Sequence, residues 1–293
     1  MFLVEGLPTI VFAVVIFLLL PDSPDTAKFL TTEEKEVAKA RAILQSGKEG
    51  TARLGGFAWE EALAACRSPQ TWIQPLMYFS CNVSFVSLPV FLPTIITAMG
   101  YSSIDAQGLT APPYFLAFIV CIATTYLADR TQQRGLVIMV LSLVATVGYV
   151  LLAAARSVGV RYLGVFLAAA GVFPAIANIL SWVLNNQGTD TKRGVGIAML
   201  NIIGQCGPLL GTRVFPASAA PYYVKGMCIC AAFMLFNALL AFTLRMYFLR
   251  ENRRLEKQEG SETGGVGGVV TGKAGVPTQM VEMEGVTGYR FVL

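Results

Sequence analysis

The sequence predicts an all-α polytopic membrane protein, and three observations predict it. Of the 293 residues, 55% are hydrophobic and 14% are charged, whereas a soluble globular domain carries about 25% charged residues. The mean hydropathy is +0.61. The apolar residues form continuous runs of about 20 residues, the length that crosses a bilayer as a helix, and these runs lack the alternation of a membrane β-strand.

Seven runs have this length, and we expect each of them to be one spanning helix. In chain order, the predicted spans are Met1–Leu20, Thr71–Ala98, Ala111–Leu127, Leu136–Ala155, Tyr162–Leu184, Val195–Phe215 and Lys225–Tyr247.

The basic residues predict the orientation of these spans. All but four of the 22 lysines and arginines fall on one side of the membrane if the 21–70 connection is cytoplasmic. Cytoplasmic segments carry the excess of basic residues in membrane proteins. We therefore expect a cytoplasmic C-terminus and an outer N-terminus. The same bias accounts for the net charge of +4 without a nucleic-acid partner.

The connections outside the spans have signals of their own. The spacing Thr31-Thr-Glu-Glu34 is that of a capping box, so a charged helix is predicted over Glu33–Gln45 within the cytoplasmic 21–70 loop. The segment Phe57–Cys66 is predicted to form a short amphipathic helix at the inner membrane–water interface. Residues 251–293 are predicted to be a cytoplasmic disordered tail, because the end of the chain is rich in Gly and Val.

Three predicted spans carry hydrogen-bonding pairs four residues apart, so that each pair lies on one face of its helix. An amide in hydrocarbon is costly unless it meets a partner or a water-filled cavity. These side chains either join helices, at about 0.6 kcal/mol per bond, or line a cavity for a small polar solute, which the presence of three pairs favours. The candidate path residues are Tyr78, Asn82, Asn178, Trp182, Asn201 and Gln205.

Prolines and glycines also fall inside the spans. Pro89, Pro93, Pro174 and Pro208 are expected to interrupt their helices, and broken helices are tolerated where they line a cavity. The segment Gly204–Gly211 has small residues four apart, which indicates either close helix packing or a hinge.

Metal, cofactor and enzyme chemistry are not predicted. The chain has no histidine, its six cysteines form no CxxC pair, and no nucleophile lies near a base in the sequence pattern. Of the acidic residues, only Glu5 lies well inside a predicted span, and Asp129 lies at a cytoplasmic edge. The chain alone therefore offers no obvious group for proton coupling.

A short polar stretch, Tyr126-Leu-Ala-Asp-Arg-Thr-Gln-Gln-Arg-Gly135, separates the third and fourth spans. Asp129 can meet the partly positive N-terminus of a helix, and Arg130 and Arg134 can bind carbonyls or carboxylates across a gate. We predict a gating loop made of these three residues. The stretch resembles the cytoplasmic signature loop of the major facilitator superfamily, except that Thr125 stands where that family has Gly.

Other motifs extend the resemblance over nearly the whole chain, to the fungal anion:cation symporter group that includes the allantoate, nicotinate, pantothenate and biotin permeases. This resemblance implies proton-coupled uptake of a small organic anion by alternating access. We expect the protein to reside in the plasma membrane. The motifs are Glu5-Gly-Leu-Pro8, Pro21-Asp-Ser-Pro24, Phe173-Pro174 with Trp182 and Asn185-Asn186, Thr191-Lys-Arg193, Glu251-Asn-Arg-Arg254 and the allantoate permease-like end Tyr289-Arg-Phe-Val-Leu293.

That family has twelve helices in two halves. Residues 1–20 resemble its sixth helix, 21–70 its central loop and 71–250 its C-terminal six-helix half. We therefore expect an N-terminally truncated permease or a misplaced gene start. Two alternatives stay open: a non-transporting fragment that pairs with or inhibits an intact permease, and a seven-helix receptor.

Overall fold

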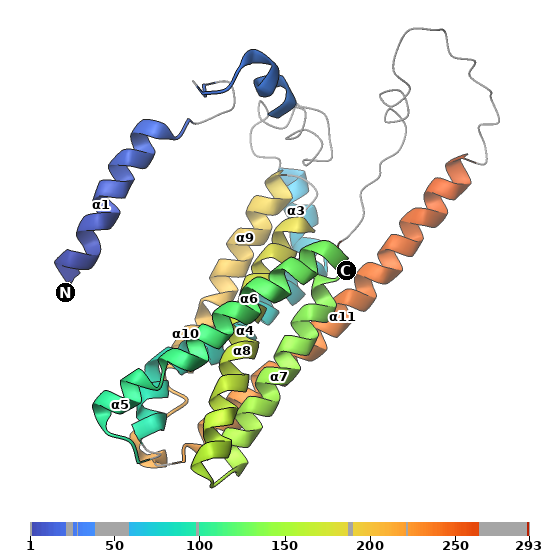
Figure 1. Ribbon diagram of the computed structural model, residues 1–293. Coiled ribbons are helices and arrows are strands. Elements are labelled where there is room, and N and C mark those ends of the chain that lie inside the picture. Colours follow the sequence, from blue (N-terminus) through green and yellow to red (C-terminus); the bar gives the residue numbers. More distant parts are fainter. Residues whose placement is uncertain are drawn as a thin grey trace, which may run out of the picture. The chain divides into compact units, whose positions relative to one another are not determined.

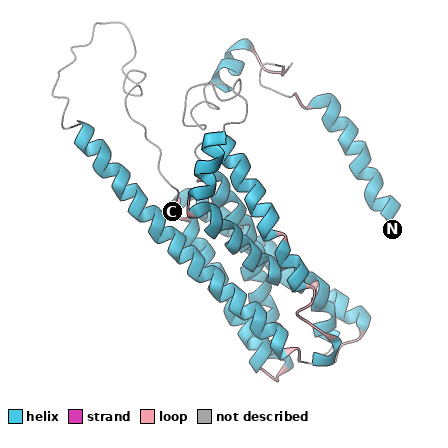
Figure 2. Ribbon diagram, turned by 180° about the vertical axis from the view of Figure 1, so that it is seen from behind, coloured by secondary structure: helices cyan, strands magenta, loops and turns pink. Residues whose placement is uncertain are grey.

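The computed structural model describes residues 2–21, 26–27, 29–38, 59–97, 100–186, 190–220, 222–263 and 292. These residues separate into two compact units, one within Met1–Gly56 and the other within Phe57–Leu293. Each unit is described by itself below, and Figures 1 and 2 show their helices from opposite sides.

The first unit contains α1 (Phe2–Leu19), an apolar helix of 18 residues with Pro8 inside it. At 1.5 Å per residue, α1 is about 27 Å long. Residues 32–38 are also helical, and the predicted capping box is confirmed. The Thr31 N–H donates to Glu34 Oε2 at 2.9 Å, and the Glu34 N–H donates to Thr31 Oγ1 at 3.4 Å. The hydrogen bonds from Thr31 lower the pKa of Glu34. The rest of the helix predicted over Glu33–Gln45 lies outside the described residues.

All regular elements among the described residues of the second unit are helices, which confirms the predicted fold class. It has six helical spans long and apolar enough to cross a membrane, and α9 with α10 forms one of them. Its elements are α3 (Trp59–Arg67), α4 (Gln70–Thr97), α5 (Ser103–Gly108), α6 (Ala111–Thr131), α7 (Arg134–Ala154), α8 (Val158–Asn185), α9 (Asp190–Gly204), α10 (Cys206–Gly211), the 3-10 turn η1 (Ala217–Ala219) and α11 (Val224–Thr263).

Two helices continue beyond the apolar runs that predicted the spans. Helix α6 continues through Asp129 and Arg130 to Thr131, although the apolar run ends at Leu127. Helix α11 extends to Thr263, so residues 251–263 are helical and not a disordered tail. Glu, Lys and Arg are good helix formers, and they continue a helix that the membrane has already nucleated.

The prolines interrupt fewer helices than the sequence predicted. Helix α4 is continuous through Pro89 and Pro93, and α8 is continuous through Pro174, so those three predictions were wrong. A proline removes one backbone hydrogen bond, and neighbouring helices and adjacent side chains compensate for the loss in a membrane. The sixth predicted span is broken, since α9 ends at Gly204 and α10 begins at Cys206, close to Pro208.

Glycines bring α7 and α8 into backbone contact. A Cβ added at Gly148 of α7 would lie 2.5 Å from the backbone N of Ala168, and one at Gly164 of α8 would lie 2.9 Å from the carbonyl O of Gly148. A Cβ at Gly171 would lie 2.5 Å from the carbonyl O of Leu141. Small residues at these positions allow the close approach on which helix association in a membrane depends.

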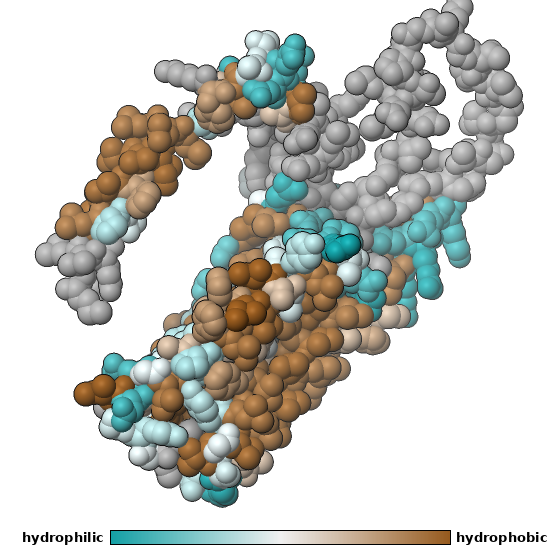
Figure 3. Space-filling model, viewed as in Figure 1, coloured by the Kyte–Doolittle hydropathy of each residue, from teal (hydrophilic) through white to brown (hydrophobic). Residues whose placement is uncertain are grey.

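Figure 3 shows the surface expected of such a bundle, with apolar residues along its long side and hydrophilic residues gathered toward its ends. Large apolar side chains are exposed on the spanning helices, among them Phe115 of α6 at 65% and Leu239 of α11 at 58%. A soluble protein would not expose so much apolar surface. The fold is that of an integral membrane protein.

Candidate functional site

The polar pair on α4 holds this helix against the broken span. Tyr78 and Asn82 are buried, and Asn82 Nδ2 donates to the carbonyl O of Gly204 at 3.1 Å. A Cβ at Gly204 would lie 2.2 Å from Tyr78 Cδ1, so the tyrosine ring rests on the glycine. The two α4 side chains therefore meet α9 at the residue where that helix ends.

The glycines after the break also pack against α4. A Cβ at Gly207 would lie 2.6 Å from the carbonyl O of Phe79, and a Cβ at Gly211 would lie 2.6 Å from the carbonyl O of Val83. Of the two interpretations open for the Gly204–Gly211 segment, the geometry supports close helix packing. Gln205 is the single residue between α9 and α10.

The polar pair on α9 points away from the helices of this unit. Asn201 and Gln205 are both exposed, and Asn201 Nδ2 donates to the Ile197 carbonyl O of its own helix at 2.9 Å. Asn201 is the central residue of the apolar span Thr191–Gly211. An exposed amide at mid-span is costly against lipid, so this face suits water or another polar surface.

The third pair lies inside α8. Asn178 is fully buried, its Nδ2 donates to the Pro174 carbonyl O at 2.9 Å, and its Oδ1 has no partner among the described residues. Trp182 is 1% exposed and packs edge-on against Phe248 of α11, with ring centroids 5.7 Å apart. The six predicted path residues thus occupy three places in this unit, and their role in a path stays a prediction.

The predicted gating loop is a tight corner between two helices. Asp129 and Arg130 belong to the last turn of α6, Arg134 is the first residue of α7, and only Gln132 and Gln133 link them. Gln132 has a left-handed φ of 54°, and its Nε2 donates to the Asp129 carbonyl O at 2.6 Å. This bond satisfies a carbonyl that the helix end would otherwise leave free.

An ion pair closes the corner. Arg134 Nη2 binds Asp129 Oδ1; the arginine side chain is 6% exposed and the aspartate 55%. Arg134 Nε and Nη1 are buried without a partner among the described residues. Arg130 is exposed, so the structure brings together two of the three predicted gating residues.

Residues of α8 and α11 contact the corner between α6 and α7. Arg245 of α11 donates from Nη2 to Gln133 Oε1 at 3.0 Å. A Cβ at Gly135 would lie 2.9 Å from Trp182 Cζ2 and 3.3 Å from the Cβ of Arg245. Trp182 therefore lies directly against the start of α7, beside Arg134.

Two polar contacts in the structure were not predicted from the sequence. Asn237 of α11 is fully buried, and its Nδ2 donates to Ser142 Oγ of α7 at 2.9 Å. At the other end of the bundle, the guanidinium groups of Arg156 and Arg161 lie 4.3 and 5.1 Å from the ring centroid of Tyr222. Pairing between distant residues leaves no signal in one sequence.

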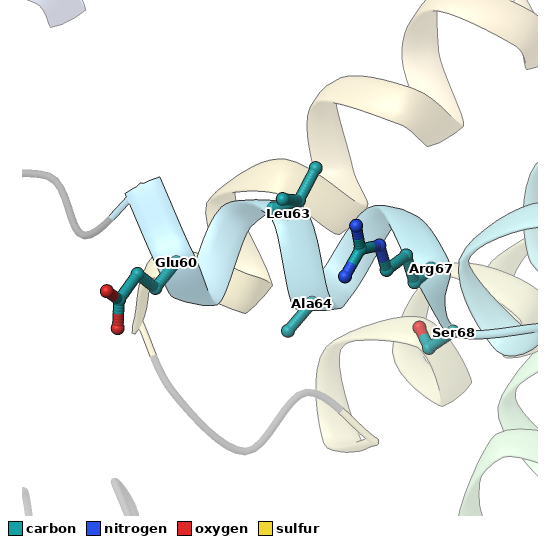
Figure 4. Close-up of a pocket in the computed structure, with 5 residues that line it drawn as sticks. All are labelled: Glu60, Leu63, Ala64, Arg67 and Ser68. Carbon is teal, nitrogen blue, oxygen red and sulfur yellow. The ribbon is translucent and has the colours of Figure 1, made fainter.

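Two hollows in the described surface lie away from the predicted path residues. One, of about 490 Å³, lies along α3 and is shown in Figure 4. The other, of about 300 Å³, lies between α7 and α11 and has an entirely apolar lining. Among the described residues, no group of three or more His, Cys, Asp or Glu could hold a metal ion. The first hollow is lined by Glu60, Leu63, Ala64, Arg67 and Ser68.

Comparison with known proteins identifies relatives of this chain. The family model described as Major Facilitator Superfamily matches residues 1–212. MFS transporter prlL of Fungal sp. (strain NRRL 50135) is 32% identical over 273 residues, covering 92% of this chain and 54% of that protein. MFS-type transporter cnsO of Penicillium expansum is 30% identical, covering 87% and 51%.

A third relative has a named substrate. The protein named high-affinity nicotinic acid transporter of Saccharomyces cerevisiae is 28% identical over 251 residues, covering 86% of this chain and 46% of that protein. The chain thus spans about half the length of these curated relatives.

Proposed function

The chain belongs to the Major Facilitator Superfamily, and from this membership we propose that its six-helix unit is one half of an alternating-access transporter for a small organic anion. We further propose that transport is coupled to protons, that the C-terminus is cytoplasmic and that the protein resides in the plasma membrane. The resemblance to fungal anion:cation symporters and the distribution of basic residues support these points.

The observation that carries the proposal is the exposed amide pair on α9. Asn201 lies at the centre of a span, and Gln205 lies at the break between α9 and α10. Transporters place their solute sites near the middle of the bilayer, on broken helices that line a cavity. We assign the face of α9 that carries these two residues to the solute path.

Helix α4 packs against α9 and fixes its position. The Asn82 bond to Gly204 and the ring of Tyr78 hold the end of α9 in place. Asn178 and Trp182 are buried within the unit, and they enter the path only in a conformation in which α8 has shifted. Alternating access requires such a second conformation.

The α6–α7 corner is the proposed gate. The pair of Asp129 and Arg134 holds the corner closed, and the exposed Arg130 is available to an opposing surface. Arg134 has two buried nitrogen atoms without partners among the described residues. A carboxylate or a set of carbonyls from an opposing element would satisfy them, and the corner then has two alternative sets of contacts.

A monocarboxylate is the proposed substrate class. The named substrate of the yeast relative, nicotinic acid, is a planar anion whose ring nitrogen and carboxylate accept hydrogen bonds. The Asn and Gln amides on α9 can donate such bonds. The coupling group for protons is proposed to lie outside the six spanning helices of this unit.

Uptake of labelled nicotinate tests the proposal in yeast cells that lack their own nicotinate uptake. We expect a protonophore to abolish this uptake. Asn201→Leu should reduce uptake at least about tenfold, because a lost hydrogen bond to a charged ligand costs about 1.5–3 kcal/mol. Ile202→Leu should leave uptake unchanged. Ile202 is the exposed apolar neighbour on the same helix. Equal uptake by both variants at equal membrane abundance would contradict the proposal.

The same cells separate transport from a partner role. If the chain gives no uptake alone but changes the uptake of a co-expressed intact relative, it acts as a partner and not as a transporter.

A further inference from the structure

Val292 is hydrogen-bonded at the end of α8. Both backbone polar groups of Val292 have partners. Its N–H donates to Asn186 Oδ1 at 2.7 Å. Its carbonyl O accepts from Trp182 Nε1 at 2.7 Å and from Asn186 Nδ2 at 3.2 Å.

The two partners are buried and ordered by the helix itself. Asn186 is 0% exposed and Trp182 is 1% exposed, and Asn186 Nδ2 also donates to the Trp182 carbonyl O at 3.0 Å. The Asn186 amide therefore offers one acceptor and one donor side by side, as a neighbouring strand would. Buried polar groups without partners are costly, so an empty site would have to take up water or rearrange.

In the sequence, Val292 lies far beyond Thr263, the last residue of α11. Helix α11 packs against Trp182 at Phe248 and then continues to Thr263, about 22 Å farther along its axis. Val292 nevertheless lies at the level of Trp182 and packs against the hydrophobic core. Val292 thus contacts the end of α8 beside Trp182, well before the described end of α11.

The site lies next to the α6–α7 corner. Trp182 presses against Gly135, the residue after Arg134, which is paired with Asp129. A segment that fixes the indole by hydrogen bonding also fixes the surface on which the start of α7 rests.

We propose that Trp182 and Asn186 form a docking site that binds the backbone of the chain's own segment at Val292, and that docking holds Trp182 against the α6–α7 corner. The recognised chemistry is one backbone N–H and one backbone C=O, together with the apolar side chain of Val292, which packs against the core. This gives a role to the Tyr289–Leu293 motif, which the proposed transport function leaves without one. The docking site stands independently of the transported substrate.

Trp182 fluorescence in the full chain tests the proposal. Trp59→Phe and Trp72→Phe leave Trp182 as the sole reporter, and quenching by acrylamide measures its access to solvent. Val292→Pro removes the N–H that Asn186 accepts. One lost hydrogen bond lowers the ratio of docked to undocked chains about fivefold, so quenching should rise. Val292→Ile keeps the N–H and should match the parent.

A peptide in trans completes the test. The hexapeptide Gly-Tyr-Arg-Phe-Val-Leu, residues 288–293, should lower the quenching of the Val292→Pro protein to the level of the parent. The same peptide N-methylated at Val292 should not lower it. Circular dichroism checks that helix content is equal in all variants. Equal quenching of the Val292→Pro and Val292→Ile proteins would overturn the proposal, as would failure of the unmethylated peptide to restore protection.

Concentration separates an intramolecular contact from an exchange between copies. Quenching of the parent should not change on dilution in detergent, because the segment belongs to the same chain. A rise in quenching on dilution would overturn docking within one chain.

Discussion

Replacing Gly148 with alanine should separate α7 from α8. The added Cβ would lie 2.5 Å from the Ala168 backbone N and 2.8 Å from the Gly164 carbonyl O, whereas carbon contacts are optimal at about 3.5–4.0 Å. Both colliding atoms are backbone, so no side chain can rotate away. The helices must move apart by about 1 Å, and such a gap forfeits about a quarter to a half of the dispersion energy of each contact.

The expected loss follows from two opposing contributions. Overpacking of this kind costs about 3 kcal/mol, and alanine gains up to about 1 kcal/mol over glycine within a helix. Gly148→Ala should therefore lower the free energy of unfolding by about 2 kcal/mol. Gly159→Ala is the matched control, because its Cβ would have no neighbour within 4 Å.

Unfolding in mixed micelles, followed by circular dichroism, measures the two free energies. We expect the control to be as stable as the parent or up to about 1 kcal/mol more stable. The two variants should then differ by about 3 kcal/mol. If Gly148→Ala is as stable as Gly159→Ala, the close contact of α7 and α8 does not exist as described.

Two further substitutions test individual polar contacts. Asp129→Asn should lower the free energy of unfolding by about 1–2 kcal/mol, which is less than a fully buried pair would lose because the aspartate is half exposed. Arg130→Gln, at an exposed residue, should change the free energy of unfolding by less than about 0.5 kcal/mol. Equal effects of the two substitutions would refute the contribution of the ion pair. Asn237→Leu should stay within about 1 kcal/mol of the parent, since the lost bond to α7 is offset by removal of a buried carbonyl without a described partner. A loss above about 3 kcal/mol would show that this amide organises the interface.

Hydropathy located the spans but not their ends. The apolar run before the polar stretch stops at Leu127, yet α6 ends at Thr131, because the charged residues that leave the membrane are still good helix formers. Pro174 illustrates the opposite error. Proline breaks helices in water, but α8 stays continuous through it because neighbouring helices support the weakened turn.

The spacing of four predicted which polar residues share a face, but not what that face meets. Tyr78 and Asn82 proved buried against α9, whereas Asn201 and Gln205 of the same pattern are exposed. The difference depends on where glycines such as Gly204 let two helices approach. One sequence does not state which helices are neighbours, so the packing partners of Trp182 and the docking of Val292 were also beyond prediction.

The accessibility of the α9 face to water tests the central claim most directly. With the six cysteines replaced by alanine, single cysteines introduced by Asn201→Cys, Gln205→Cys and Val147→Cys are exposed in native membranes to a charged thiol reagent. Val147 is 52% exposed on α7 and serves as the lipid-facing control. The thiolate is the reactive form and needs water, so the two α9 variants should react at least about tenfold faster than the control. Reaction no faster than that of the Val147→Cys variant would contradict a solute path along α9.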